Sequence, residues 1–298
     1  MSDLLANPVV VTILPPLLAG LLLGLLAWVS SGNRIAMALG WGIGLLFIYW
    51  LLEGVPPLPP IAAKQKLGYL LALGGLAGFA LIAWRFSPLI SRLKYIALAA
   101  LAVISLGWSK FGGADSLWVL LLAIAVSGLL SAGSIAAMSL TDSQTPQAAV
   151  ERTFIIPTAY LTTAIAGSIV AASSLFLGMA QMLGALAAML GGAIAVGFFA
   201  LLARGRGIDL LPQGAAMAVA NALLCAVALT ALLAPSANGL ALVLLSLGPL
   251  LAALLANRLA MALPGIALFR PILAGAIIAV PAIIASLIAV FTGTSPFA

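Results

Sequence analysis

Long uninterrupted runs of apolar residues are the feature that most constrains the fold of this chain. Residues 8–29, for example, read PVVVTILPPLLAGLLLGLLAWV and hold no charged side chain. A helix needs about 20 apolar residues to cross the roughly 30 Å hydrocarbon core of a membrane. In hydrocarbon, every backbone N–H and C=O must be paired within the protein, so only helices and closed barrels can span it. Barrel strands alternate apolar and polar residues, so these continuous runs predict helices.

The sequence therefore predicts an all-α integral membrane protein with about ten transmembrane helices. The expected helices are residues 8–29, 35–53, 67–84, 94–109, 117–139, 153–176, 179–203, 211–233, 239–257 and 271–292. The apolar segment 258–270 either extends the ninth helix or lies along the membrane interface. The loops are too short for a soluble domain, so residues 1–298 are expected to form a single transmembrane domain.

Charge is scarce and its distribution predicts the orientation. Only 6% of the residues are charged, against roughly 25% in soluble domains, so membrane lipid must be the main partner of this surface. With the N-terminus outside, the inner loops carry Arg34, Arg85, Arg92, Lys94, Arg152, Arg204, Arg206, Arg258 and Arg270, and the outer loops only Lys64, Lys66 and Lys110. The positive-inside rule then predicts both termini on the non-cytoplasmic side of a bacterial inner (cytoplasmic) membrane. The cations form no long cluster, so nucleic acid is not an expected partner.

Short matches between the two halves of the chain indicate a five-plus-five inverted repeat. The halves would be residues 1–139 and 153–298, joined by the polar loop 140–152. Residues 12–15 read T-I-L-P and residues 154–157 read F-I-I-P, so Pro15 and Pro157 follow similar residues. An S-L-G sequence begins at both Ser105 and Ser246. The alternative is a ten-helix bundle with no repeat, because Leu/Ala-rich sequences also match by chance.

Prolines within the expected helices mark candidate substrate-binding segments. Inverted-repeat carriers bind their solute near the midplane, often at interrupted helices. The interruption signals here are Pro15, Pro16, Pro157, Gly248, Pro249 and Pro281. The alternative for each proline is a simple kink, which membrane helices tolerate.

The polar residues expected inside the membrane are neutral. Ser127, Ser131 and Ser134 share one helix face, which is typical of helix–helix packing in membranes. Tyr160 and Asn221 are better candidates for contact with a ligand, because large polar groups in hydrocarbon need a partner. The substrate-binding candidates are therefore Pro15, Pro16, Ser105, Pro157, Tyr160, Asn221, Ser246, Gly248 and Pro249.

Enzyme signatures are absent from the sequence. It contains no His, and its single Cys225 lies in an apolar run. It has no paired carboxylates on one helix and no Gly-rich phosphate loop followed by Lys. We therefore expect no catalytic residues, no metal site and no cofactor, and the protein is not expected to be an enzyme.

The architecture resembles two groups of carriers: the drug/metabolite transporter superfamily, and the bile-acid-symporter and auxin-carrier type. The paired S-L-G sequences at Ser105 and Ser246, with Gly248 and Pro249, resemble the second group, whose fourth and ninth helices are broken where they cross. The resemblance extends over the whole chain as architecture only, so it implies a carrier fold and assigns no site residue.

Two functions follow as hypotheses. The first is a secondary transporter of a small organic or amphipathic solute. The second is a non-catalytic subunit or scaffold of a larger membrane complex, with protein subunits or a second copy of the chain as partners. Pro157→Ala or Asn221→Leu should abolish transport by a carrier, yet leave the assembly of a scaffold nearly intact.

Overall fold

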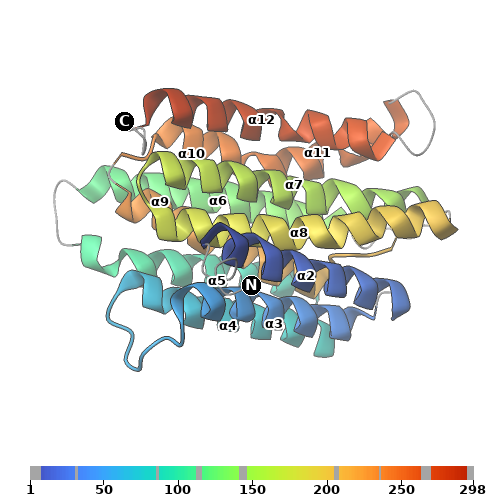
Figure 1. Ribbon diagram of the computed structural model, residues 1–298, viewed down its shortest axis with the longest axis horizontal. Helices are drawn as coiled ribbons and strands as arrows, with labels where there is room; N and C mark the ends of the chain where they lie inside the picture. Colours follow the sequence, from blue (N-terminus) through green and yellow to red (C-terminus); the bar gives the residue numbers. More distant parts are fainter. Residues whose placement is uncertain are drawn as a thin grey trace.

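The computed structural model describes residues 8–30, 33–84, 87–111, 116–140, 146–204, 208–234, 236–262 and 270–293. This part of the chain forms a bundle of long helices connected by short segments (Figure 1). The helices are α2 (Pro8–Val29), α3 (Arg34–Glu53), α4 (Ala63–Ala83), α5 (Pro88–Gly107), α6 (Leu117–Leu140), α7 (Pro146–Ser173), α8 (Leu177–Arg204), α9 (Gln213–Leu233), α10 (Gly239–Ser246), α11 (Gly248–Ala262) and α12 (Arg270–Thr292). A single 3-10 turn, η1 (Trp108–Lys110), follows α5.

The predicted all-helical architecture is confirmed in the described part of the chain. Nine of its helices are long and apolar enough to cross a membrane. The expected ninth helix is instead divided, because α10 ends at Ser246 and α11 begins at Gly248. A count of ten spanning helices is therefore not confirmed. α11 continues to Ala262, and residues 263–269 of the ambiguous segment lie outside the described residues.

Two helices begin well before the predicted positions. α5 starts at Pro88 rather than at residue 94, and the Ser87 hydroxyl accepts the Ile90 N–H at 3.5 Å. A serine N-cap followed by proline in the first turn is a strong start signal, because proline needs no N–H partner there. α7 starts at Pro146 rather than at residue 153. The early start of α5 places Tyr95 two turns inside the helix.

α9 is the central helix of the bundle. It packs against α3, α4, α5 and α6, and touches α7 and α8. Every residue from Gly214 to Leu232 is buried. A helix that is apolar around its whole circumference is expected in the interior, where no face needs to meet solvent or lipid.

Small residues bring several helix pairs into close contact. A Cβ added at Gly78 of α4 would collide with the backbone oxygen of Gly214 in α9, and one at Gly20 of α2 would collide with that of Met189 in α8. Membrane helices associate mainly through packing of this kind, because lipid is as apolar as the side chains. Glycine is thus required at these contacts to let two backbones approach.

The packing of the two halves is not equivalent in the described chain. α2 packs along α8, and an inverted repeat would pair α7 with α3 in the same way. α7 instead packs along α8, α11 and α12. The predicted repeat is therefore not confirmed.

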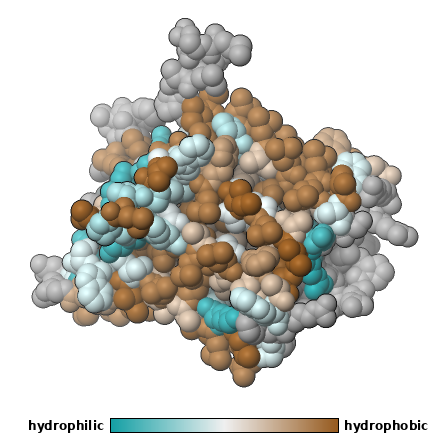
Figure 2. Space-filling model, turned by 90° about the horizontal axis from the view of Figure 1, so that it is seen from below, coloured by the Kyte–Doolittle hydropathy of each residue, from teal (hydrophilic) through white to brown (hydrophobic). Residues whose placement is uncertain are grey.

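The surface is mainly apolar. In the view of Figure 2, brown apolar side chains cover most of the face, and hydrophilic ones gather mainly toward its left edge. That edge is the end of the bundle where α3 ends and α4 begins (Figure 1). There Lys64 Nζ pairs with Glu53 at 2.8 Å, and Lys66 Nζ donates to Ser105 O at 3.0 Å. Because successive helices run in opposite directions, Arg34, Arg92 and Lys94 lie at the other end.

Candidate functional site

Five hydroxyl side chains on three helices form the most polar part of the described interior. They are Tyr95 of α5, Ser127, Ser131 and Ser134 of α6, and Tyr160 of α7, and we call them the hydroxyl cluster. All five are at least 92% buried. The Tyr95 and Tyr160 hydroxyls both lie close to the hydroxyl of Ser134, and Tyr95 also lies close to Cys225 of α9. The cluster therefore lies where α5, α6 and α7 meet the central helix.

The cluster lies inside the apolar spans, toward the end of the bundle where α5 and α7 start and α6 ends; Ser134 is three residues before the end of the span Leu117–Ala137. Tyr95 lies six residues after the start of the span Leu89–Lys110, and Tyr160 six residues after the start of Phe154–Ser173. At 1.5 Å per residue, each lies about 9 Å inside its span. The three serines are spaced i, i+4 and i+7, so they follow one face of α6 for about 10 Å.

None of the five hydroxyls meets the distance and angle requirements of a hydrogen bond with another group of the described chain, although the Tyr95 and Tyr160 hydroxyls both approach that of Ser134. Buried hydroxyls such as those of Ser174 and Thr230 differ from them in this respect. Ser174 Oγ donates to Val170 O at 2.6 Å, and Thr230 Oγ1 donates to Ala226 O at 2.9 Å. Back-bonding to the carbonyl four residues earlier is the usual solution for such a residue in a helix. The cluster does not use it, so its hydrogen-bonding capacity is left for something else.

The energetic cost of leaving these groups unpaired is large. A buried hydroxyl without a partner costs about 1–3 kcal/mol. Five of them would cost on the order of 5–15 kcal/mol, which equals the whole net stability of a typical domain. Buried water or a polar solute is therefore the expected partner.

Asn221 lies on α9 and its side chain is already engaged. Its Nδ2 donates to Leu70 O of α4 at 2.9 Å, and its Oδ1 accepts from Cys225 Sγ at 3.8 Å. A Cβ added at Gly74 of α4 would collide with the Asn221 amide. The side chain thus joins α9 to α4, which gives it a structural role in addition to the predicted ligand contact.

The predicted interruption at Gly248 and Pro249 coincides with a break of one residue, Leu247, between α10 and α11, at which the backbone stays in the right-handed helical region. Ser246 is fully buried, and its Oγ donates to Leu242 O at 2.7 Å. Across the break, Thr163 Oγ1 of α7 donates to Leu245 O at 3.3 Å, and a Cβ on Gly248 would lie 2.8 Å from the same Thr163 oxygen. The break therefore packs directly against α7, three residues from Tyr160.

The other predicted site residues lie in continuous helices. Pro15 and Pro16 are inside α2, Pro157 is inside α7, and Pro281 is inside α12, and none of them ends its helix. Ser105 lies near the end of α5, where its Oγ donates to Ala102 O at 3.1 Å. α2 packs mainly on α8 and α3, and α5 packs on α4, α6 and α9. The structure brings Tyr160 and the α10–α11 break together, but it does not bring Pro15, Pro16 or Ser105 to them.

Tyr95 and the serine face are the functional candidates that sequence reasoning missed. Tyr95 would lie at a helix end if the helix began at residue 94, but Ser87 and Pro88 begin it two turns before Tyr95. The spacing of Ser127, Ser131 and Ser134 is compatible both with helix–helix packing and with a face that binds a ligand. Only the missing hydrogen bonds distinguish the two.

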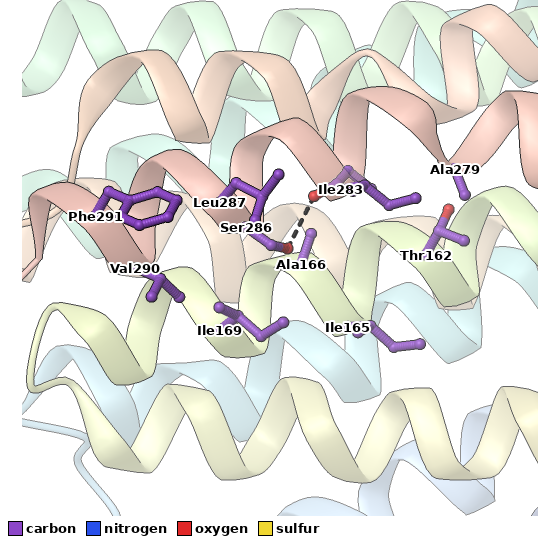
Figure 3. A pocket seen from close by; sticks show the side chains of 11 residues that line it. Thr162, Ile165, Ala166, Ile169, Ala279, Ile283, Ser286, Leu287, Val290 and Phe291 are labelled. Atoms are coloured by element: carbon purple, nitrogen blue, oxygen red, sulfur yellow. Dashed lines mark hydrogen bonds between the residues drawn. The ribbon is translucent and has the colours of Figure 1, made fainter.

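An apolar groove lies between α7 and α12, on the outside of the bundle (Figure 3). Its volume is about 440 Å³. Ile165 and Ile169 of α7 face Ile283 and Leu287 of α12 across it. Ser286 and Thr162 also line the groove, and their hydroxyls donate to their own helices, to Ala282 O at 2.8 Å and Ala159 O at 3.1 Å. The groove therefore offers no free polar group of the hydroxyl cluster's kind.

No group of acidic, His or Cys side chains among the described residues could hold a metal ion. Comparison with known proteins adds no further assignment. No protein-family model matches the chain, and neither does any curated protein or solved structure. A functional proposal for this chain therefore depends on its own geometry.

Proposed function

We propose that the chain is a secondary membrane transporter for a small organic solute, which binds at the hydroxyl cluster. The observation that carries this proposal is the set of five buried hydroxyls without partners in the described chain. The hydrocarbon core of a membrane holds no bulk water that could bond to such groups. A bound polar molecule would supply the hydrogen bonds that they lack. The break between α10 and α11 also supports it, because carriers of this class often bind solutes beside interrupted helices.

Uptake into vesicles tests the proposal. The purified chain is reconstituted in proteoliposomes, and exchange of labelled solutes is compared between the natural chain and Tyr160→Phe. Saturable exchange that falls with Tyr160→Phe is the expected result. Exchange no faster than in protein-free vesicles, for every solute in a panel of neutral, acidic and basic compounds, would reject the transporter.

The second candidate is a non-catalytic subunit of a larger membrane complex. The groove between α7 and α12 favours it, because Ile283, Leu287 and Phe291 leave a large apolar area exposed there, at 53%, 51% and 83%. Large exposed apolar patches often mark interaction sites, although in a membrane lipid also covers them.

Gentle extraction separates the two candidates. The native membrane is solubilised in a mild detergent, and the species containing this chain is analysed by native electrophoresis and mass spectrometry. Migration alone or as a homodimer supports the transporter. Migration with unrelated proteins in fixed stoichiometry supports the subunit.

We propose that the protein lies in a bacterial inner membrane, with both termini on the non-cytoplasmic side. The grouping of charges supports this orientation. Lys64 and Lys66 lie at one end of the bundle, whereas Arg34, Arg92 and Lys94 lie at the other. The more basic end is assigned to the cytoplasm.

A further inference from the structure

The chemistry of the hydroxyl cluster is entirely neutral. Each Ser and Tyr hydroxyl donates one hydrogen bond and also accepts. The adjoining groups from α9 are the neutral Cys225 and the Asn221 amide, which is already bonded. The cluster therefore offers a mixture of donors and acceptors, and its five side chains and the two α9 groups carry no fixed charge.

The described charged side chains nearest to the cluster in sequence, Arg92 and Lys94, lie toward the N-terminal end of α5. Arg92 is one turn nearer the end of α5 than Tyr95 and is exposed. Lys94 is adjacent to Tyr95, so it projects about 100° around the helix from it. Long cationic side chains near helix ends commonly extend toward the interface.

An ion in this cluster would lose its hydration without gaining an opposite charge. Burial of an unpaired charge in a low-dielectric interior is far more costly than burial of a paired hydroxyl. A neutral solute with hydroxyl or amide groups would instead exchange its bonds to water for bonds to the five side chains.

We infer that the hydroxyl cluster selects an uncharged solute that carries hydroxyl or amide groups, and that it discriminates against anions and cations of the same size. This inference rests on the proposed transport function and adds the substrate class. The tyrosines on α5 and α7 and the serine face of α6 hold the solute from three sides.

The experiment compares probes that are matched in size but differ in charge. Proteoliposomes containing the full chain are tested for exchange of glycerol, sorbitol and acetamide, of the anions glycerate, gluconate and acetate, and of the cations serinol and glucamine. We expect saturable exchange of at least one neutral probe and background exchange of all the charged ones. Tyr160→Phe and Ser134→Ala should each slow the neutral exchange about tenfold, the effect of one lost hydrogen bond.

A matched variant controls for general effects on folding. Thr230→Val removes a buried hydroxyl of α9 that bonds only to its own helix. It should leave exchange of the neutral probe unchanged. A loss as large as that of Tyr160→Phe would show that the cluster has no special role and would overturn the inference.

The remaining outcomes separate the inference from the proposed function. Saturable exchange of a charged probe, reduced by the cluster variants, would overturn the neutral selectivity but retain the transporter. Background exchange of every probe would reject both, and would leave buried water as the partner of the hydroxyls.

Discussion

Asn221 and Tyr160 are both large polar side chains in an apolar interior, but they differ in their hydrogen bonds. Asn221 is bonded to the neighbouring helix through Leu70 O. The Tyr160 hydroxyl has no partner among the described residues. Removal of a hydrogen-bonded group loses the stabilisation from that bond. Removal of a buried group without a partner removes only the cost of its desolvation. The two residues should therefore respond oppositely to substitution.

Asn221→Leu should lower the free energy of unfolding by about 1–2 kcal/mol, because it removes the bond between α9 and α4. The bond between α9 and α4 thus adds a stability cost to a change that was expected to leave assembly nearly intact. Denaturant-induced unfolding in detergent measures the effect. Stability equal to that of the natural chain would show that the Asn221 bond contributes nothing.

Tyr160→Phe and Ser134→Ala should leave stability unchanged or raise it when no solute is present. Each change removes a buried oxygen that has no protein partner. The melting temperature in detergent is the measurement. A decrease for both variants would mean that their hydroxyls are bonded in the empty protein, for example to tightly held water.

At the scale of elements, the helix contacts depend on where glycine lies. Gly78 of α4 sits against the backbone of Gly214 in α9, whereas a Cβ on Gly128 of α6 would meet nothing within 4 Å. The two positions form a natural pair for comparison, because both are glycines inside membrane-spanning helices.

Gly78→Leu should destabilise the protein by about 1–3 kcal/mol or more, because the added side chain forces α4 away from α9. Gly128→Leu is the control and should be neutral or slightly stabilising, since leucine has the higher helix propensity. Thermal unfolding of both variants provides the comparison. Equal melting temperatures would contradict the close α4–α9 contact.

The sequence predicted helices far better than their contacts. Hydropathy located the nine long apolar helices of the described chain, because a spanning segment must be apolar whatever its neighbours are. The Gly248-Pro249 pair also predicted the interruption between α10 and α11. The hydroxyl cluster was not predictable, since it depends on Tyr95, Ser134 and Tyr160 meeting from three helices. The hydrogen bond from Asn221 to Leu70 O was not predictable either, because it also joins two helices and 151 residues separate the pair.

At the scale of the whole molecule, the single cysteine offers a test of orientation. Cys225 is fully buried, so the natural chain should not react with a membrane-impermeant maleimide. In a Cys225→Ala background, Lys64→Cys should react from the non-cytoplasmic side and Arg34→Cys from the cytoplasmic side. The reverse labelling pattern would place the N-terminal end of the chain in the cytoplasm.

The buried position of α9 has a consequence for biogenesis. α3, α4, α5 and α6 leave the ribosome before residue 213 is made, yet each packs against α9. The early helices can enter the membrane in order, but the space among them stays unfilled until α9 has been inserted. A nascent chain that stops after α8 should therefore remain loosely associated and susceptible to quality-control proteolysis, and it should become compact only when α9 arrives.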